Sequence, residues 1–257
     1  MTDRTPLKIV LLAADGMTTN IVFNAIEREH RLSGVIIEEP VPRRTYLLRR
    51  ARRLGYVEAA GQALFQILVP PLLRRVSRRR VEEILASCGL DASPVPQSRV
   101  ARVTSANATE THALLARLSP DVVVINGTRI LGAATLAAVP ARFVNVHTGI
   151  TPMYRGVHGG YWALASSDVA NCGVTVHEVD SGLDTGAVLH QARIAPSRRD
   201  NFVTYPLLQL GVALPLLLQY LAAPGAGVAT DPHAPSRAWS HPTLWGYVKT
   251  YARTGVR

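Results

Sequence analysis

The sequence has 257 residues, 47% of them hydrophobic and 18% charged, and its formal net charge is +10. This composition excludes a disordered chain and predicts a globular protein with a core of its own. The two cysteines, Cys88 and Cys172, lie far apart, which argues against a disulfide framework or a cysteine-based zinc site and favours a reducing compartment. The N-terminal residues lack a signal-peptide pattern, so we expect a cytoplasmic protein.

Strand and helix patterns alternate along the first 200 residues. A buried strand over 9–13 is followed by a turn at Asp15-Gly16, a helix over 20–28 and a second strand over 33–37. Asn107 is expected to cap a helix that runs to residue 118. Further strands are predicted over 100–103, 121–125, 143–146, 173–177 and 187–192. This alternation predicts an α/β fold with a Rossmann-like, mostly parallel sheet and helices on both faces.

An arginine-rich segment interrupts the alternation between residues 41 and 96. Residues 41–80 contain eleven arginines and one acidic residue, Glu58, so they account for the whole net charge. We interpret the segment as a basic helical insert in a catalytic domain over 1–200, and residues 201–257 as a short C-terminal helix and tail. A solvated helical face is the simplest interpretation of the insert. Contact with anionic lipid and steering of an anionic substrate are the alternatives.

Two apolar stretches of the sequence are candidates for membrane spans. Residues 63–73 are too few, and residues 205–221 are interrupted by two prolines and two glutamines. We therefore expect 205–221 to form a helix that packs on the core. A linker rich in proline, glycine and alanine follows over 222–236, and an aromatic segment over 239–251 comes after it.

The most specific motif begins at Asn145. Asn145 and His147 are two residues apart at the end of a predicted strand, so their side chains point to the same side of the sheet. The carboxyl ends of parallel strands form the edge where ligand crevices lie in α/β folds. Thirty residues after His147, a predicted strand ends in His177 and leads into a glycine-containing loop that carries Asp180 and Asp184.

These residues resemble the folate-dependent formyltransferases, which include glycinamide ribonucleotide, methionyl-tRNA and sugar N-formyltransferases. The family pattern is Asn-x-His-x-x-x-x-Pro-x-Tyr-x-Gly, followed by an Asp in a loop after a strand that ends in His. The resemblance covers residues 7–38 and 98–221. It implies that Asn145, His147 and Asp184 are catalytic, and the spacing from His177 favours Asp184 over Asp180. It also implies 10-formyltetrahydrofolate as the co-substrate and no metal.

Formyl transfer to an amine explains why these residue types are needed. The attack produces an oxyanion, which Asn145 and a protonated His147 are expected to stabilise. His147 and Asp184, acting through a water molecule, would move the proton from the amine to the departing nitrogen. Transfer is direct, and accordingly the sequence shows no serine or cysteine nucleophile motif.

The resemblance implies two further groups of binding residues. The folate would contact a loop after the central strand and the loop after His177, through Thr128, Arg129, Ile130, Leu131, Val179, Asp180 and Gly182. The acceptor would contact Tyr154 and Arg155, and an anionic group on it would contact the helix start at Gly16, Thr18 and Asn20. A plain helix cap explains these last three residues equally well. His177 and His158 are expected to be structural.

Departures from the family pattern bear on the acceptor. The family's common His-Pro-Ser is replaced by His147-Thr148-Gly149, and the helix start at 107–109 lacks the arginine that glycinamide ribonucleotide enzymes present to phosphate. The region after Leu221 is too short for the C-terminal barrel of the transfer-RNA enzymes. We therefore favour a small-molecule amine, an amino-sugar nucleotide above all, and expect no nucleic-acid partner. Glycinamide ribonucleotide, methionyl-tRNA and a non-catalytic ligand-binding role are the alternatives, and a homodimer is considered as the assembly.

Overall fold

A seven-stranded sheet organises the fold, in the order β3-β2-β1-β4-β5-β7-β8. The computed structural model describes residues 6–225, 227–228 and 234–257. The five strands from β3 to β5 run parallel, whereas β7 is antiparallel to β5 and β8 is antiparallel to β7. The strands are β1 (Ile9–Ala14), β2 (Leu32–Glu38), β3 (Val100–Val103), β4 (Val122–Asn126), β5 (Arg142–His147), β7 (Gly173–Glu178) and β8 (Val188–Arg193). The predicted mostly parallel sheet is confirmed.

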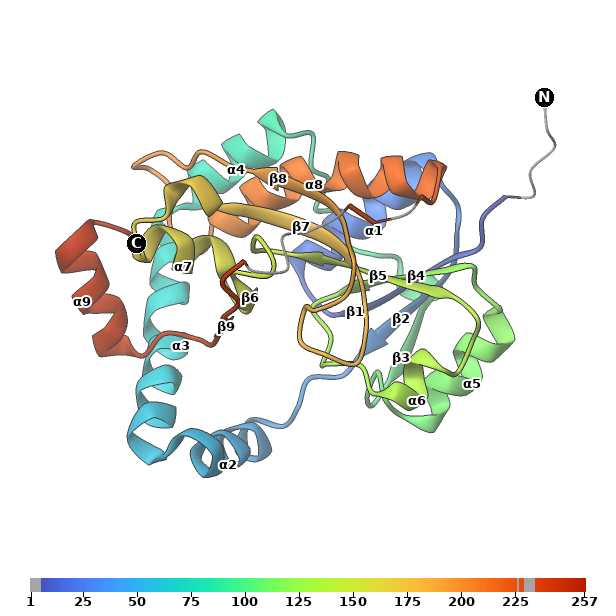
Figure 1. The fold of residues 1–257 in the computed structure, drawn as a ribbon, viewed down its shortest axis with the longest axis horizontal. Coiled ribbons are helices and arrows are strands. Elements are labelled where there is room, and N and C mark those ends of the chain that lie inside the picture. The colour runs from blue at the N-terminus through green and yellow to red at the C-terminus, as the bar shows by residue number, and fades with distance from the viewer. Residues whose placement is uncertain (1–5, 226, 229–233) are drawn as a thin grey trace.

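Helices cover both faces of the sheet, as predicted (Figure 1). Along β1, Ile9 and Leu11 join a core cluster with α1 and α8, while Val10 and Leu12 join a second cluster on the opposite face, which includes residues of α5. The strand is buried on both faces, which explains its continuous apolar sequence. The helices of these two layers are α1 (Met17–Glu29), α5 (Thr109–Leu118), α6 (Ala133–Leu136) and α8 (Tyr205–Ala222), and short 3₁₀ turns lie at Gln97–Arg99 and Val169–Asn171.

Helix α8 is the apolar stretch that was considered as a membrane span. By length and composition alone it is apolar enough to cross a bilayer, but 56% of that window is buried inside the protein. It packs against β7 and β8, and the Gln209 side chain donates a hydrogen bond to the Gly173 carbonyl. The prediction of a helix that packs on the core is confirmed.

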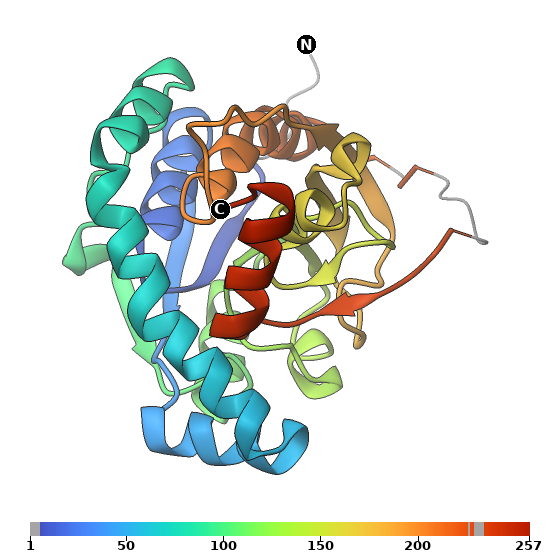
Figure 2. The ribbon, with the colours of Figure 1, turned by 90° about the vertical axis from the view of Figure 1, so that its left-hand side faces the viewer.

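The basic insert consists of three helices, α2 (Arg43–Leu54), α3 (Tyr56–Val76) and α4 (Arg78–Ser87). Helix α4 lies against α8, whereas α2 packs on α3 and none of its residues is buried. Figures 1 and 2 show α2 at the end of α3 that is farthest from α4, away from the sheet. The predicted helical insert is confirmed, and its distal part projects from the body.

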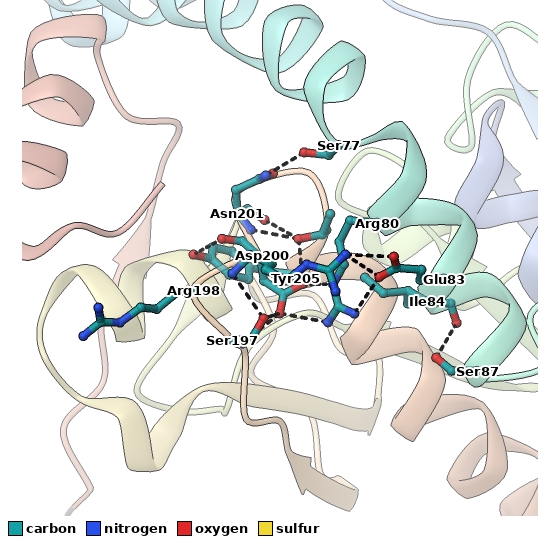
Figure 3. A network of polar contacts seen from close by, with 12 residues as sticks. Ser77, Arg80, Glu83, Ile84, Ser87, Ser197, Arg198, Asp200, Asn201 and Tyr205 are labelled. Carbon is teal, nitrogen blue, oxygen red and sulfur yellow. Dashed lines mark hydrogen bonds and ion pairs between the residues drawn. The ribbon is translucent and has the colours of Figure 1, made fainter.

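A buried ion pair fastens the base of the insert to the body (Figure 3). The Arg80 guanidinium donates two hydrogen bonds to Asp200, at 2.8 and 3.0 Å, and the backbone N–H of Ser197 donates a third at 2.7 Å. Burial disfavours the charged form of Asp200, but these donors outweigh it and hold the carboxyl pKa below its ordinary value. Beside this pair, the Asn201 amide donates to the Ser77 hydroxyl at 2.7 Å.

The C-terminal segment returns to the middle of the chain. Strand β9 (Ala238–Trp239) pairs with β6 (Arg155–Gly156), and helix α9 (Leu244–Thr254) packs against α3 near α7 (Gly159–Ala165). The predicted linker over 222–236 lies partly outside the described residues.

Two local predictions differ from the structure. The first helix begins at Met17 and not at residue 20, because Gly16 is its N-cap. Ala108, and not Asn107, is the N-cap of α5. The Asn107 side chain instead accepts a hydrogen bond from the Gly132 N–H at 2.6 Å and donates one to the Ile130 carbonyl at 2.9 Å. Asn107 therefore shapes the loop after β4.

Candidate active site

Four polar side chains meet where β5, β7 and the loop after β7 come together. The antiparallel register places Asn145 opposite His177, and the Asn145 Nδ2 lies 3.2 Å from the His177 Nε2. Asp184 lies between the two histidines, with Oδ2 3.5 Å from the His147 Nδ1 and Oδ1 3.5 Å from the His177 Nε2. The structure thus brings the three predicted catalytic residues together and adds His177 to them.

The backbone fixes the orientation of His147. Its Nε2 lies 2.7 Å from the carbonyl oxygen of Tyr154. Because a carbonyl only accepts, Nε2 must carry the ring hydrogen, so in the neutral tautomer the lone pair is on Nδ1, toward Asp184. A methyl group on Gly149 would lie 2.7 Å from this Nε2 and 2.3 Å from the Tyr154 carbonyl oxygen. Only glycine leaves room here for the contact between the imidazole and the carbonyl.

The charge state of the site follows from burial. Burial lowers the pKa of His147 below its ordinary value, although the nearby Asp184 acts in the opposite direction. The resting site therefore favours the neutral imidazole, and the protonated His147 expected beside the oxyanion stays a prediction. Burial raises the pKa of Asp184, but its contacts with His177, His147 and the Gly156 N–H outweigh burial and lower that pKa overall. The resting site pairs a carboxylate with a neutral imidazole.

A shaped loop presents Asp184 to the histidines. The residue has a left-handed backbone conformation, with φ of 51°, and its Oδ2 accepts a hydrogen bond of 2.8 Å from the Gly156 N–H. Arg155 holds the preceding residue by donating to the Leu183 carbonyl at 3.0 Å. Asp180 instead accepts hydrogen bonds from the Gly182 N–H and from a threonine hydroxyl within the same loop. The structure therefore places Asp184, and not Asp180, at the histidines.

The residues predicted to bind folate lie in two loops, and the first of them follows β4. The Arg129 guanidinium donates to the Thr104 and Glu39 carbonyls, and its backbone N–H donates to Glu38, so this side chain fastens the loop to the end of β2. Leu131 is buried in the core, whereas Ile130 is 58% exposed. In this loop Thr128, Ile130 and backbone groups therefore form the surface that a ligand could contact.

The second loop begins with Val179, whose N–H donates to the Phe143 carbonyl at 2.8 Å. Asp180 and Gly182 form the turn within it, so the Asp180 carboxylate serves the conformation of the loop. Folate binding by these residues, and by those of the loop after β4, stays a prediction.

The residues predicted to bind the acceptor are dispersed. Asn20 is engaged with the end of the insert, where its side chain contacts the Ala92 carbonyl and the Val95 N–H at 3.4 Å each. The Thr18 hydroxyl accepts from Asn126 at 3.3 Å, and Gly16 is exposed at the start of α1. These residues lie at the carboxyl end of β1, which is separated from β5 by β4. They do not join the cluster around Asp184.

Tyr154 contributes its backbone rather than its hydroxyl. The hydroxyl donates to Asp168 at 2.8 Å, and the ring stacks on Trp239 with centroids 5.9 Å apart. Burial and the Asp168 carboxylate raise the pKa of Tyr154 to about 12. The hydroxyl is thus engaged with Asp168, and the carbonyl is the group of Tyr154 that reaches His147. Contact of Tyr154 with the acceptor stays a prediction.

Two residues of the site were missed by sequence reasoning. His177 was expected to be structural, yet its side chain, only 2% exposed, touches both Asn145 and Asp184. Its Nδ1 lies 2.6 Å from the Glu178 carbonyl, which sets the ring orientation. Gly149 entered the sequence analysis only as a departure from the family's His-Pro-Ser, although its missing side chain leaves room for the contact between His147 and the Tyr154 carbonyl. Within residues 6–225, 227–228 and 234–257, no cluster of three or more His, Cys, Asp or Glu side chains could hold a metal.

Solved structures of other proteins share this fold. The seven-stranded sheet resembles a phosphoribosylglycinamide formyltransferase from Streptococcus pneumoniae, with a TM-score of 0.51 and 23% identity over 84% of this chain and 97% of that one. It also resembles a sugar N-formyltransferase from a Shewanella species, with a TM-score of 0.52 and 14% identity over 89% and 76% of the two chains. At these identities the likeness establishes the fold class.

The sequence comparisons point to one family. Residues 85–205, which include Asn145, His147 and Asp184, match the model of the formyl transferase family. A methionyl-tRNA formyltransferase from Koribacter versatilis is 35% identical over 125 residues, or 48% of this chain and 39% of the relative. One from Anaeromyxobacter dehalogenans is 31% identical over 152 residues, or 59% and 47%. The chain thus spans about half the length, or less, of these curated relatives.

Proposed function

We propose that the protein transfers a formyl group from 10-formyltetrahydrofolate to the primary amine of a small, phosphate-bearing molecule, with an amino-sugar nucleotide as the preferred acceptor. The observation that carries the proposal is the convergence of Asn145, His147 and Asp184, with an ionised carboxylate 3.5 Å from the free Nδ1 of a neutral imidazole. The match of residues 85–205 to the formyl transferase family supports the same reaction.

His147 supplies the base. As the bond between the acceptor nitrogen and the formyl carbon forms, the amine must lose a proton, and the Nδ1 of His147 is the atom free to take it. Asp184 then faces the imidazolium and stabilises its charge. The bond from the formyl carbon to the donor nitrogen breaks next, and the same Nδ1 returns the proton to that nitrogen. The proton lost by the amine thus ends on the donor nitrogen, and no covalent enzyme intermediate forms.

Asn145 supplies the oxyanion donor. One hydrogen of its Nδ2 faces the His177 Nε2 at 3.2 Å, which fixes the rotamer and leaves the second hydrogen for the formyl oxygen. Negative charge on that oxygen grows in the transition state, so a fixed donor stabilises the transition state more than the ground state. The site is largely shielded from water, with the His147 side chain only 5% exposed, and this strengthens the contact.

The folate is proposed to lie between the loop at Thr128–Leu131 and the loop at Val179–Asp184. The exposed Ile130 offers an apolar surface for a planar ring. The Arg155 Nε is buried and has no hydrogen-bond partner among the residues that the structure describes, so it is a polar group near the second loop that a ligand could satisfy. When bound, the folate supplies the activated formyl carbon, and these loops hold it against His147.

Methionyl-tRNA is the second candidate acceptor. It is favoured by the curated relatives, which are methionyl-tRNA formyltransferases, and by the eleven arginines of residues 41–80. The small amine is favoured by the neutral charge of the remaining chain, because a transfer RNA needs a basic surface around the site itself.

An acceptor screen tests the proposal. Purified protein is incubated with 10-formyltetrahydrofolate and, separately, with amino-sugar nucleotides, glycinamide ribonucleotide and charged initiator transfer RNA, and formyl addition is read by mass. We expect addition to one small amine, and thermal protection by folate but not by NAD, ATP or zinc. Folate at about a hundred times its Kd adds about 2.7 kcal/mol to the free energy of unfolding. Addition to the transfer RNA alone would replace the small amine as acceptor, and no folate binding at all would remove the proposal.

A further inference from the structure

The outer surface of the insert carries apolar side chains that the fold leaves uncovered. On α3, Val57, Leu64, Ile67, Leu68 and Leu72 are each between 44% and 76% exposed, and we call these five residues the apolar stripe. Val57, Leu64, Leu68 and Leu72 recur at spacings of seven, four and four, so they lie on one face of the helix. Other residues of α3, among them Phe65 and Leu73, are buried against the body.

Such a helix is apolar on both sides, which solvation alone does not explain. A helix at the surface of a soluble domain normally turns a polar face outward, and a contiguous apolar surface marks a binding site. Leu47 and Leu48 on α2 extend this surface, at 41% and 48% exposure. Helices α2 and α9 both pack on α3, yet the five side chains of the stripe stay between 44% and 76% exposed.

Arginines surround the apolar stripe. Five exposed arginines lie on α2, next to the start of the stripe: Arg43, Arg44, Arg49, Arg52 and Arg53. Arg74 and Arg75 lie just beyond its other end at Leu72, and both are exposed. Residues 41–80 hold one acidic residue against eleven arginines, while the rest of the chain is neutral. Both views of the fold place α2 and the adjoining part of α3 away from the sheet.

We propose that the apolar stripe and the arginines of α2 form a membrane-docking surface for an anionic lipid bilayer. The leucines, isoleucine and valine enter the boundary between headgroups and acyl chains, as in interfacial helices. The long arginine side chains lie along the same boundary and keep their guanidinium groups among the lipid phosphates. Each such arginine strengthens binding to an anionic surface by about fivefold.

Two other occupants explain the surface less well. An RNA would be bound through its phosphates by the arginines, but it would leave the exposed leucines and isoleucine without a partner. A second copy of the chain would cover the leucines, but a symmetric contact would bring the arginines of the two α2 helices together, and like charges repel. An anionic bilayer matches both the charge and the apolar side chains.

Vesicle sedimentation with the full chain tests the proposal. We expect binding to vesicles of phosphatidylglycerol and phosphatidylcholine in equal parts, and little binding to pure phosphatidylcholine. Changing Arg44, Arg49, Arg52 and Arg53 to Gln removes four charges and should weaken binding by more than about a hundredfold. Changing Leu64 and Leu68 to Ser keeps the charge and should weaken it on the order of tenfold or more.

Matched controls separate the surface from general effects. Arg31 and Arg117 are exposed on the body, and their change to Gln should leave vesicle binding intact; the same holds for the exposed Val169 changed to Ser. Thermal unfolding checks that each variant is folded. The proposal does not depend on formyl transfer, because lipid binding is read without substrate.

Three outcomes would overturn the proposal. The first is wild-type protein that binds a duplex RNA but not the anionic vesicles. The second is a Leu64 and Leu68 variant that binds those vesicles as well as the wild type does. The third is wild-type protein that does not bind the vesicles and elutes as a dimer in size-exclusion chromatography, while the Leu64 and Leu68 variant elutes as a monomer.

Discussion

Replacing Gly149 by Ala tests whether the position of His147 governs the proposed reaction. The new methyl carbon would lie 2.3 Å from the Tyr154 carbonyl oxygen and 2.7 Å from the His147 Nε2. Comfortable contacts to such atoms are about 3.5 Å, so the carbonyl and the imidazole must separate by about 1 Å. A misplacement of that size costs about a hundredfold in rate, and the overpacking costs about 1–3 kcal/mol of stability.

The assay compares kcat and kcat/KM for formyl transfer with urea denaturation of the same protein. Gly225→Ala is the matched control, because a methyl group there would meet, among the described residues, only the Ala223 carbonyl oxygen, at 3.9 Å. We expect Gly149→Ala to lose about a hundredfold in kcat while it stays folded, and Gly225→Ala to lose nothing. Wild-type kcat in a folded Gly149→Ala protein would refute the role given to the contact between the Tyr154 carbonyl and the imidazole.

Three further predictions follow from the site and its supports. Asp184→Asn should lower kcat by about a hundredfold or more in steady-state assays, because imidazolium loses its counter-charge, and Asp180→Asn should do less; the reverse order would show that Asp180 is the catalytic carboxylate. Asp200→Asn should lower the free energy of unfolding in urea by about 3 kcal/mol, because it leaves a partly buried arginine unpaired, and a loss below about 1 kcal/mol would contradict that role. Burial lowers the pKa of His158 to about 3 and of His241 to about 4. The folded state resists their protonation, so stability should fall as pH drops below about 6.5, and stability independent of pH between about 6.5 and 4 would contradict this.

The sheet could be predicted from the sequence because its signal is local. A run such as Ile9 to Ala13 is apolar without alternation, and only a strand buried on both faces explains it in an α/β pattern. The same holds for the residues around Val123 in β4. The start of α1 was misplaced by three residues because Gly16 is its N-cap. The cap of α5 was misplaced by one residue because a long-range contact engages the Asn107 side chain.

The site was harder to predict because its contacts depend on pairing between distant strands. The spacing of Asn145 and His147 placed both side chains on one side, but only the antiparallel register of β5 and β7 sets His177 opposite Asn145. A shift of one residue would have turned His177 to the other face. The direction of Tyr154 depended on Asp168, which no local pattern links to it.

The charge of His147 could not be predicted from the motif either. An isolated histidine next to an aspartate is expected to bind a proton, whereas here burial reverses the direction of the pKa shift. Burial depends on the packing of the whole domain. A neutral imidazole is the form that can accept the amine proton, in keeping with the proton transfer that the motif implied for His147.

A single-turnover comparison on the acceptor found by the screen tests the central proposal most directly. Wild type, Asn145→Ala and His147→Ala are each mixed in excess with 10-formyltetrahydrofolate and that amine, and the formylated product is followed over time by mass. We predict a rate about a hundredfold or more below wild type for each variant, with folate affinity and thermal unfolding little changed. Product formation by both variants at the wild-type rate would contradict the proposal that Asn145 and His147 perform formyl transfer.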